Sequence, residues 1–282
     1  MVKLGFSLQA EYDCPLEQVI ALLKEAGFSA VSPVWSPKLP MAELDELTKR
    51  HNMIIQSLHA PHGGIDRLWQ PADPICAQTK SNIFSTVDTC AEYGIPIMVM
   101  HGWQGLIYTF PTEPLDFCAF DSIVDYAEQK GVKIAFENLE GEEYLAALMD
   151  RYRGRAHVGY CWDSGHDHCY PHKTDFLDSY GHRLIMTHIN DNLGYRNPED
   201  FPTPIDDLHF LPYDGNIEWP SELARLKGMP RQEILNFELK KRSASKAEKD
   251  LIYNSITAAE YIRKAGERAH RVADIYERII SE

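Results

Sequence analysis

The sequence predicts an α/β protein, a (β/α)8 TIM barrel. Short apolar segments alternate with amphipathic ones along the 282 residues, the apolar segments number eight, and six of them end at His, Asp or Glu. The length suits one large barrel, and no Ser/Gly-rich or Pro-rich linker divides the chain. We therefore expect a single domain over residues 1–282 with a long C-terminal helix.

The first half of the chain supplies four of the expected strands. Pro15 begins the first helix, in which apolar residues recur at helical spacing, and Gly27 ends it. The third and fourth strands end at His59 and His101. In order, the expected elements are a strand at residues 2–8, a helix at 15–27, a strand at 28–32, a helix at 41–51, a strand at 53–58, a helix at 77–93 and a strand at 96–100.

The second half supplies the other four strands. Gly131 ends a helix, and the strands that follow run to Glu137, Asp163, His188 and Glu238. In order, we expect a helix at residues 115–130, a strand at 132–136, a helix at 142–152, strands at 157–161 and 184–187, a helix at 217–226, a strand at 233–237 and a final helix at 247–279, whose apolar positions repeat at helical spacing.

Long loops after barrel strands commonly serve the active site. The expected loops at residues 61–74 and 191–214 are of this kind, and we expect specificity to depend on residues 61–74, 102–114 and 192–208.

The composition of the chain limits the classes of binding partner that we expect. The net charge of −14 and the pI of about 5.3 argue against nucleic acid and anionic membranes as partners. The six cysteines form no CxxC pair, which favours reduced thiols, and no apolar run of about 18 residues predicts a membrane span. The segment MVKLGFSLQAEYD has no long apolar stretch. We expect a cytoplasmic protein with no membrane partner, and both a monomer and a homo-oligomer fit the sequence.

Six expected strands end in a residue type that binds metals, and in a barrel all strand C-termini open on one face, which holds the active site. A single His or Glu at a strand end is more often structural, but six strands follow the same rule. Crowded carboxylates repel one another and a dication removes that penalty. Imidazole with carboxylate suits Zn, Mn, Co or Fe, and carboxylate-rich sites also accept Mg. The six are His59, His101, Glu137, Asp163, His188 and Glu238.

Two further segments are candidates for the same site. His166 follows Asp163 by three residues across a glycine turn. Asp207 and His209 alternate along an extended segment, so both side chains can point the same way and reach one site. A surface Asp and a capping His are the alternative for this pair.

Four motifs together resemble the xylose-isomerase-like TIM barrel superfamily: FEN at the fifth strand, WDSGH at the sixth, HINDN at the seventh and FELK at the eighth. That superfamily includes sugar isomerases, ketose 3-epimerases, inositol-pathway enzymes and endonuclease IV. The resemblance extends from Lys3 to about Leu239. It implies that the residues which hold one divalent metal (Mn, Zn, Co or Mg) are Glu137, Asp163, His188 and Glu238.

The epimerase branch of this superfamily implies roles beyond metal binding. Glu137 and Glu238 match its acid–base pair, which stands on opposite faces of the substrate carbon. His166 and Glu143 match residues that contact substrate there, although a plain position on a helix face is an equal alternative for Glu143.

The resemblance therefore implies a metal-dependent isomerase or epimerase that acts on a sugar, sugar phosphate or polyol-derived ketone, or else a dehydratase. A metal polarises the carbonyl and stabilises an enediolate, one carboxylate removes the proton beside the carbonyl, and a second returns it. Trp35, Trp69 and Trp103 are candidates for the wall of a sugar site, with packing at the rim as the alternative.

A multi-zinc phosphoesterase of endonuclease IV type is the rival hypothesis. Three departures oppose it: the segment APHGGIDRLWQPADP is unlike that enzyme's DNA-penetrating loop, YDG replaces a G-x-G, and no basic stripe is present. A non-catalytic barrel that senses a ligand is the third hypothesis. The nine residues that match the types of that enzyme's three-zinc ligands are His59, His101, Glu137, Asp163, His166, His188, Asp207, His209 and Glu238.

Overall fold

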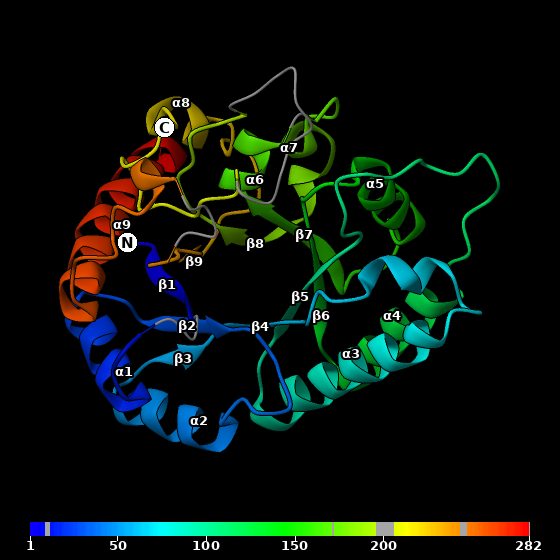
Figure 1. Ribbon diagram of the computed structural model, residues 1–282, viewed down its shortest axis with the longest axis horizontal. Helices are drawn as coiled ribbons and strands as arrows, with labels where there is room; N and C mark the ends of the chain where they lie inside the picture. Colours follow the sequence, from blue (N-terminus) through cyan, green and yellow to red (C-terminus); the bar gives the residue numbers. More distant parts are fainter. Residues whose placement is uncertain (9–11, 171, 196–205, 243–246, 282) are drawn as a thin grey trace.

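Nine parallel strand segments surround the centre of the computed structural model (Figure 1), which describes residues 1–8, 12–170, 172–195, 206–242 and 247–281. The strands are β1 (Lys3–Leu8), β2 (Ala30–Pro33), β3 (Ile54–Ile55), β4 (Ser57–His59), β5 (Ile97–His101), β6 (Lys133–Glu137), β7 (Val158–Asp163), β8 (Leu184–His188) and β9 (Ile234–Phe237).

The strands form two parallel sheets, with the orders β3-β2-β1-β9 and β4-β5-β6-β7-β8. The expected third strand is shared between them, because β3 pairs with β2 and β4 pairs with β5, with the change at Gln56. Two bridges, Val34 with His59 and Ile189 with Phe237, join the sheets at their two seams. The eight strand positions thus close a ring, which confirms the predicted (β/α)8 TIM barrel.

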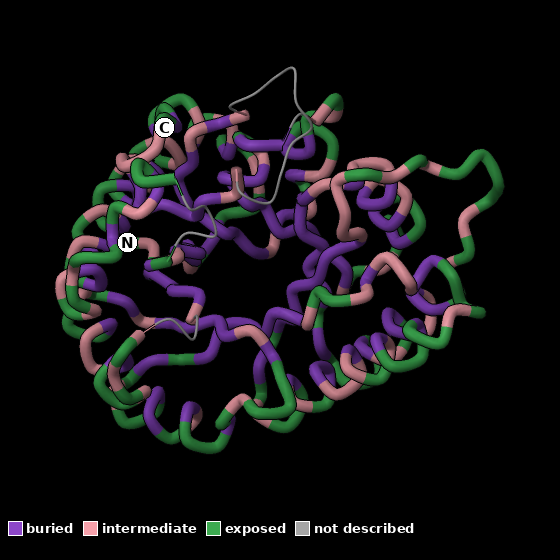
Figure 2. The backbone as a smooth tube through the Cα atoms, viewed as in Figure 1, coloured by how far each residue is buried: buried purple, intermediate pink, exposed green. Residues whose placement is uncertain are grey.

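Helices cover the outside of this ring (Figure 1). The exposed residues gather on their outer faces and the buried residues on the strands and inner faces (Figure 2). The α-helices are α1 (Leu16–Glu25), α2 (Met41–Arg50), α3 (Pro74–Tyr93), α4 (Cys118–Lys130), α5 (Glu142–Arg151), α6 (Ser164–Cys169), α7 (Phe176–Tyr180), α8 (Trp219–Ala224) and α9 (Ala258–Ser281), and the 3-10 helices are η1 (Ile65–Trp69), η2 (Gly181–Arg183) and η3 (Glu248–Asp250).

Local capping chemistry explains where several helices differ from the expectation. Helix α3 begins at Pro74, earlier than the expected residue 77, because the Asp73 carboxylate accepts a hydrogen bond from the amide of Ile75 at 2.8 Å. The final helix begins at Ala258 instead of residue 247, and the Thr257 hydroxyl accepts from the Glu260 amide at its start. Gly94 ends α3 with a φ of +67°, a left-handed conformation that glycine adopts readily.

Three short elements between β7 and β8, namely α6, α7 and η2, are absent from the sequence-based expectation because they are too short to show an apolar period. The expected helix at residues 217–226 is reduced to α8, with Pro220 in its first turn. Residues 196–205, which fall in the expected loops at 191–214 and 192–208, lie outside the described residues.

The core lies in the ring and between the ring and its helices. Phe6, Phe136 and Phe237 are fully buried on β1, β6 and β9, and Phe6 packs edge-on against Phe28 at 5.1 Å between ring centroids. The organisation as a single domain stays a prediction. Within the described residues, no helix combines the length and the apolar character that crossing a bilayer requires.

Candidate metal centre

Four side chains meet where neighbouring strands end. Glu137, Asp163 and His188 are the last residues of β6, β7 and β8, and Glu238 directly follows β9. The strands are in register at this edge, so that Asp163 pairs with His188 across β7 and β8. Each residue offers one ligand atom, and the four atoms lie within 4.8 Å of one another among buried groups. We call these four residues the quartet.

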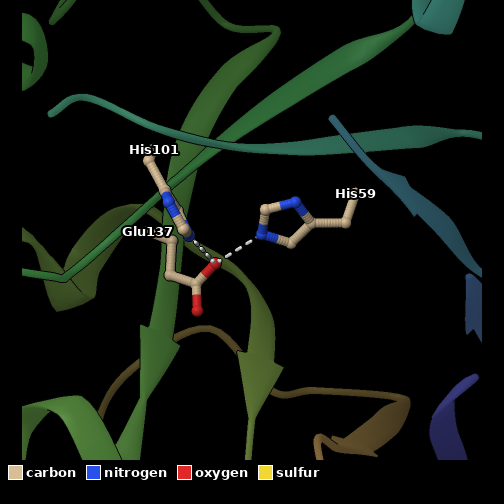
Figure 3. A group of neighbouring side chains, drawn as sticks. All are labelled: His59, His101 and Glu137. Atoms are coloured by element: carbon tan, nitrogen blue, oxygen red, sulfur yellow. Dashed lines mark hydrogen bonds and ion pairs between the residues drawn. The ribbon is translucent and has the colours of Figure 1, made fainter. Parts of the chain in front are cut away.

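Glu137 lies at the centre of a wider set of histidines. Its Oε2 is 3.1 Å from His59 Nε2 and 3.3 Å from His101 Nε2, and both rings point at the carboxylate from neighbouring strands (Figure 3). Its Oε1 is 2.9 Å from His188 Nδ1. The same imidazole nitrogen is 2.8 Å from Glu238 Oε2, so His188 lies between the two glutamates.

A third group stands beside the quartet. His209 Nε2 is 2.8 Å and His166 Nε2 is 3.5 Å from Asp207 Oδ2, and the three side chains form another set of donors close enough to hold an ion. His209 has a φ of +48°, which is uncommon for a residue with a side chain. Its Nδ1 lies 3.0 Å from the Glu238 carbonyl oxygen, and this contact fixes the ring next to the quartet.

Two asparagines from the sequence motifs hold Asp163 in place. The side-chain oxygen of Asn138, in FEN, accepts a hydrogen bond from the Asp163 backbone amide at 2.7 Å. Asn190 of HINDN donates its side-chain amide to Asp163 Oδ2 at 2.8 Å. Asp163 Oδ1 accepts the His166 amide at 2.7 Å and thereby caps α6. The motifs therefore contain both the quartet and the groups that orient it.

The glycine of WDSGH is required by this arrangement. A Cβ added at Gly165 would lie 1.8 Å from Asn190 Oδ1, closer than real contacts allow. We expect Gly165→Ala to displace Asn190 and to lower the free energy of unfolding by about 2 kcal/mol, measured by urea denaturation. Gly154→Ala is the matched control, because nothing lies within 4 Å of a Cβ there. Equal stability of the two variants would contradict this account.

The charges of the quartet fit a bound dication. Three of its members are buried carboxylates. Burial opposes the ionisation of Glu137, but His188, His101 and His59 outweigh it and hold the pKa of Glu137 well below its usual range. Burial, together with the charges of Glu137 and Glu238, raises the pKa of Asp163 to about 6, although His166 and His209 oppose the shift. A divalent cation would offset this repulsion and favour all three ionised forms.

Two buried polar atoms of the neighbouring groups point to the same conclusion. His101 Nδ1 and Asp207 Oδ1 have no hydrogen-bond partner among the described residues. Buried polar atoms are usually satisfied, so unsatisfied donors and acceptors beside a set of ligand types are consistent with an ion or water at that position.

A cavity of about 190 Å³ opens above the quartet. Glu137 and Glu238 reach its wall, whereas Asp163 and His188 are fully buried and do not. Of the further residues that the sequence predicts for the site, those that line this cavity are His59, His101, His166, Asp207 and His209.

The remaining predicted residues lie elsewhere. Glu143 accepts a hydrogen bond from the Tyr108 hydroxyl and does not line the cavity. Trp69 donates to the Gly102 carbonyl at 2.8 Å, and Trp103 stacks on Tyr144 at 4.1 Å between ring centroids, so both pack at the rim. Trp35 lines a second, neighbouring cavity.

Several cavity residues are not among those that the sequence predicts: His62, Gln104, Glu140, Tyr170 and Lys240. Glu140 follows Glu137 by three residues in FENLE, and this closeness in sequence could have marked it as a site residue. Its position in the cavity, however, depends on a hydrogen bond from the Gly105 amide. Lys240 would point away from Glu238 if the strand continued. Because β9 ends at Phe237, Lys240 instead faces the cavity, with Nζ 3.7 Å from Asp207 Oδ2.

Asp191 of HINDN organises the loop behind the site. Its carboxylate accepts hydrogen bonds from the Asn192, Tyr213 and Ile217 amides at 2.8, 2.7 and 3.1 Å, and from the Trp219 indole at 3.3 Å. Its backbone pairs with Phe210, the neighbour of His209. Gly215 leaves room for the carboxylate, because a Cβ there would lie 2.2 Å from Asp191 Oδ1.

We expect Asp191→Ala to lower the free energy of unfolding by about 3 kcal/mol, because it leaves several buried donors without an acceptor. Chemical denaturation measures this change. The matched control is Asp125→Ala, whose carboxylate is half-exposed beside Arg155 and should matter by less than about 1 kcal/mol. A loss no greater than that of the control would show that the loop is held by other contacts.

Comparison with known proteins places these features in a family. Residues 20–265 match the model of the xylose isomerase-like TIM barrel. The chain is 29% identical over 273 residues to the uncharacterised protein y4fM of Sinorhizobium fredii, an alignment that covers 80% of this chain and 82% of that protein.

Solved structures share the fold, and two of them serve as examples. The IOLI protein with a bound zinc atom superposes with a TM-score of 0.71 at 20% identity, covering 99% of this chain and 100% of that one. An L-ribulose 3-epimerase superposes with a TM-score of 0.69 at 15% identity, covering 98% of each chain.

Proposed function

The chain belongs to the xylose isomerase-like TIM barrel family, and from that premise we propose that it is a divalent-metal-dependent isomerase or epimerase. The proposed substrate is a small carbohydrate, either a sugar, a sugar phosphate or a polyol-derived ketone. The observation that carries the proposal is the placement of two glutamates, Glu137 and Glu238, on the wall of one cavity and on either side of His188.

In this proposal the quartet holds Mn, Zn, Co or Mg. When bound, the ion supplies a Lewis acid that polarises a carbonyl group. The donor set suits this task because a carboxylate-rich site with one imidazole accepts all four metals. His59 and His101, which face Glu137 Oε2, orient that carboxylate within the cavity.

Glu137 and Glu238 are the proposed acid–base pair. Burial opposes the ionisation of Glu238, but His188 and His209 outweigh it and lower its pKa, as the histidines do for Glu137. Both carboxylates are therefore held ionised before substrate binds. They come from β6 and β9, three positions apart in the ring, and so approach the cavity from different sides. One would remove the proton beside the carbonyl, and the other, after taking up a proton from water, would return one to the same carbon.

The comparisons support the proposed class of reaction without extending to a substrate. The IOLI structure contains zinc, and the ribulose epimerase acts at a sugar carbon, both on this fold. The described cavity wall is also small and polar, with donors and acceptors on several sides (His166, Asp207, Lys240 and Glu140), as a polyhydroxylated ligand requires.

The test is solvent exchange at the reacting carbon. The metal-loaded protein is incubated in deuterated water with a panel of ketopentoses, ketohexoses and inososes, and proton NMR follows loss of the signal beside the carbonyl. We expect exchange, together with an epimer or isomer, for at least one compound. Exchange with none of them, combined with tight binding of metal and ligand, would favour the non-catalytic barrel.

A specific observation also favours a second candidate function, that of a multi-zinc phosphoesterase. It is favoured by the gathering of all nine donors into three groups that each have the spacing of a metal site, two of which share Glu137. Against it stands the net charge of −14 and a described cavity wall in which Lys240 is the one lysine or arginine. Cleavage of a duplex with an abasic site, without exchange at any ketone, would establish the rival.

A further inference from the structure

A second cavity opens beside the metal cavity. Its volume is about 650 Å³, against about 190 Å³ for the cavity above the quartet. Val34 and His62 line both, so the two cavities adjoin at these residues. The wall is formed where β1 and β2 end and where α1 and α2 follow them, that is, at the same mouth of the barrel as the quartet.

The wall of this second cavity is mainly apolar. Leucine, valine, proline and tryptophan side chains supply most of it, and Ser36, Lys38 and His62 are its polar members apart from Tyr12 and Cys14. The Trp35 indole N–H already donates to Thr89 Oγ1 at 3.0 Å, so the ring is held in place and offers an apolar surface. A preformed apolar wall of this kind favours ligands that carry a hydrophobic group.

The wall of the second cavity lies close to the proposed reacting centre. Val34 forms a backbone bridge with His59, and His59 Nε2 is 3.1 Å from Glu137 Oε2. A ligand whose carbonyl carbon lies beside Glu137 would therefore have room for a substituent that passes Val34 and lies against Trp35. Free sugar hydroxyls placed there would lose their hydrogen bonds to water, which is costly, whereas an apolar ring would gain from burial.

We propose that the second cavity is a subsite for an apolar, ring-sized substituent, and that the substrate is a sugar-like ketone which carries such a group. This proposal rests on the proposed function for the reacting centre and narrows its substrate class. It disfavours a free sugar, whose hydroxyls would face an apolar wall, and a sugar phosphate, because Lys38 is the one lysine or arginine in the described wall of the subsite.

The test compares ligands that differ only in the substituent. Isothermal titration calorimetry on the zinc-loaded full chain measures the Kd of a methyl ether and a phenyl ether of the same ketohexose, each at the same hydroxyl. We expect the phenyl ether to bind at least about tenfold more tightly than the corresponding methyl ether, since it buries more apolar surface. Equal affinities in the unmodified chain would overturn the proposal.

A substitution in the wall of the second cavity tests whether the gain in affinity from the phenyl group arises there. Leu39→Asp places a charge in the apolar cavity, and we expect it to remove the phenyl preference with the metal content unchanged. Ile75→Asp is the matched control, because Ile75 is 52% exposed on α3 and lies outside the cavity wall. A phenyl preference that survives Leu39→Asp would also overturn the subsite.

Two further outcomes separate this proposal from its premise. Turnover of unsubstituted ketoses without any phenyl preference would leave the isomerase or epimerase standing and reject the subsite. A phenyl preference without proton exchange at any ketone would keep the subsite and reject the reaction. Size-exclusion chromatography tests whether a second copy of the chain occupies the cavity instead. A dimer that Leu39→Asp dissociates, together with no phenyl preference, would show that it does.

Discussion

Replacing Glu137 by glutamine is expected to lower kcat by about a thousandfold or more while the barrel stays folded. The substitution keeps the shape of a side chain that is 1% exposed but removes its charge. His59, His101 and His188, which all approach this carboxylate within 3.3 Å, would lose its charge, and one of its two acceptor oxygens would become an NH2 donor. In the proposed mechanism the same change removes a metal ligand and one member of the acid–base pair.

Steady-state kinetics on the ketone identified by solvent exchange measures this effect, and far-UV circular dichroism checks the fold. Glu128→Gln is the matched control, because that carboxylate is 52% exposed and pairs with Arg155 on the outside of the barrel. We expect the control to retain full activity. Normal turnover by Glu137→Gln would reject the proposed mechanism.

Replacing His188 by alanine is expected to weaken metal binding by more than about tenfold. His188 Nδ1 lies between Glu137 Oε1 and Glu238 Oε2, at 2.9 and 2.8 Å, and is the one imidazole of the quartet. Without it, three buried carboxylates remain close together with no compensating charge among them. Such a site is expected to protonate in part and to hold a dication less well.

Metal content after dialysis against a buffered free-ion concentration measures the change. His182→Ala is the control, since His182 is exposed in η2, just before the first residue of β8 and thus at the opposite end of that strand from His188. Unchanged metal content in His188→Ala would mean that a different set of residues holds the ion.

The barrel could be predicted from the sequence because its strands and helices carry distinct apolar patterns. Strands buried on both faces, such as β5 (IMVMH) and β7 (VGYCWD), appear as short apolar runs. The convergence of Glu137, Asp163, His188 and Glu238 followed from the same pattern, since parallel strands present their C-terminal ends on one face.

Residues placed by loops could not be predicted in this way. Glu140 reaches the cavity through a hydrogen bond from the Gly105 amide, 35 positions away in the chain. Lys240 faces the cavity because β9 ends three residues earlier, at Phe237, and strand ends are the least predictable part of a pattern. The second cavity depends on how the segments after β1 and β2 lie together, which no local period records.

The account as a whole depends on a single divalent ion held by the quartet. Elemental analysis of the purified protein, with each metal counted per chain, tests this most directly. We predict about one Mn, Zn, Co or Mg per chain, as expected for a Lewis-acid isomerase or epimerase. About three zinc ions per chain would contradict the account in favour of the phosphoesterase, and no metal after reconstitution with excess divalent ion would contradict the metal centre itself.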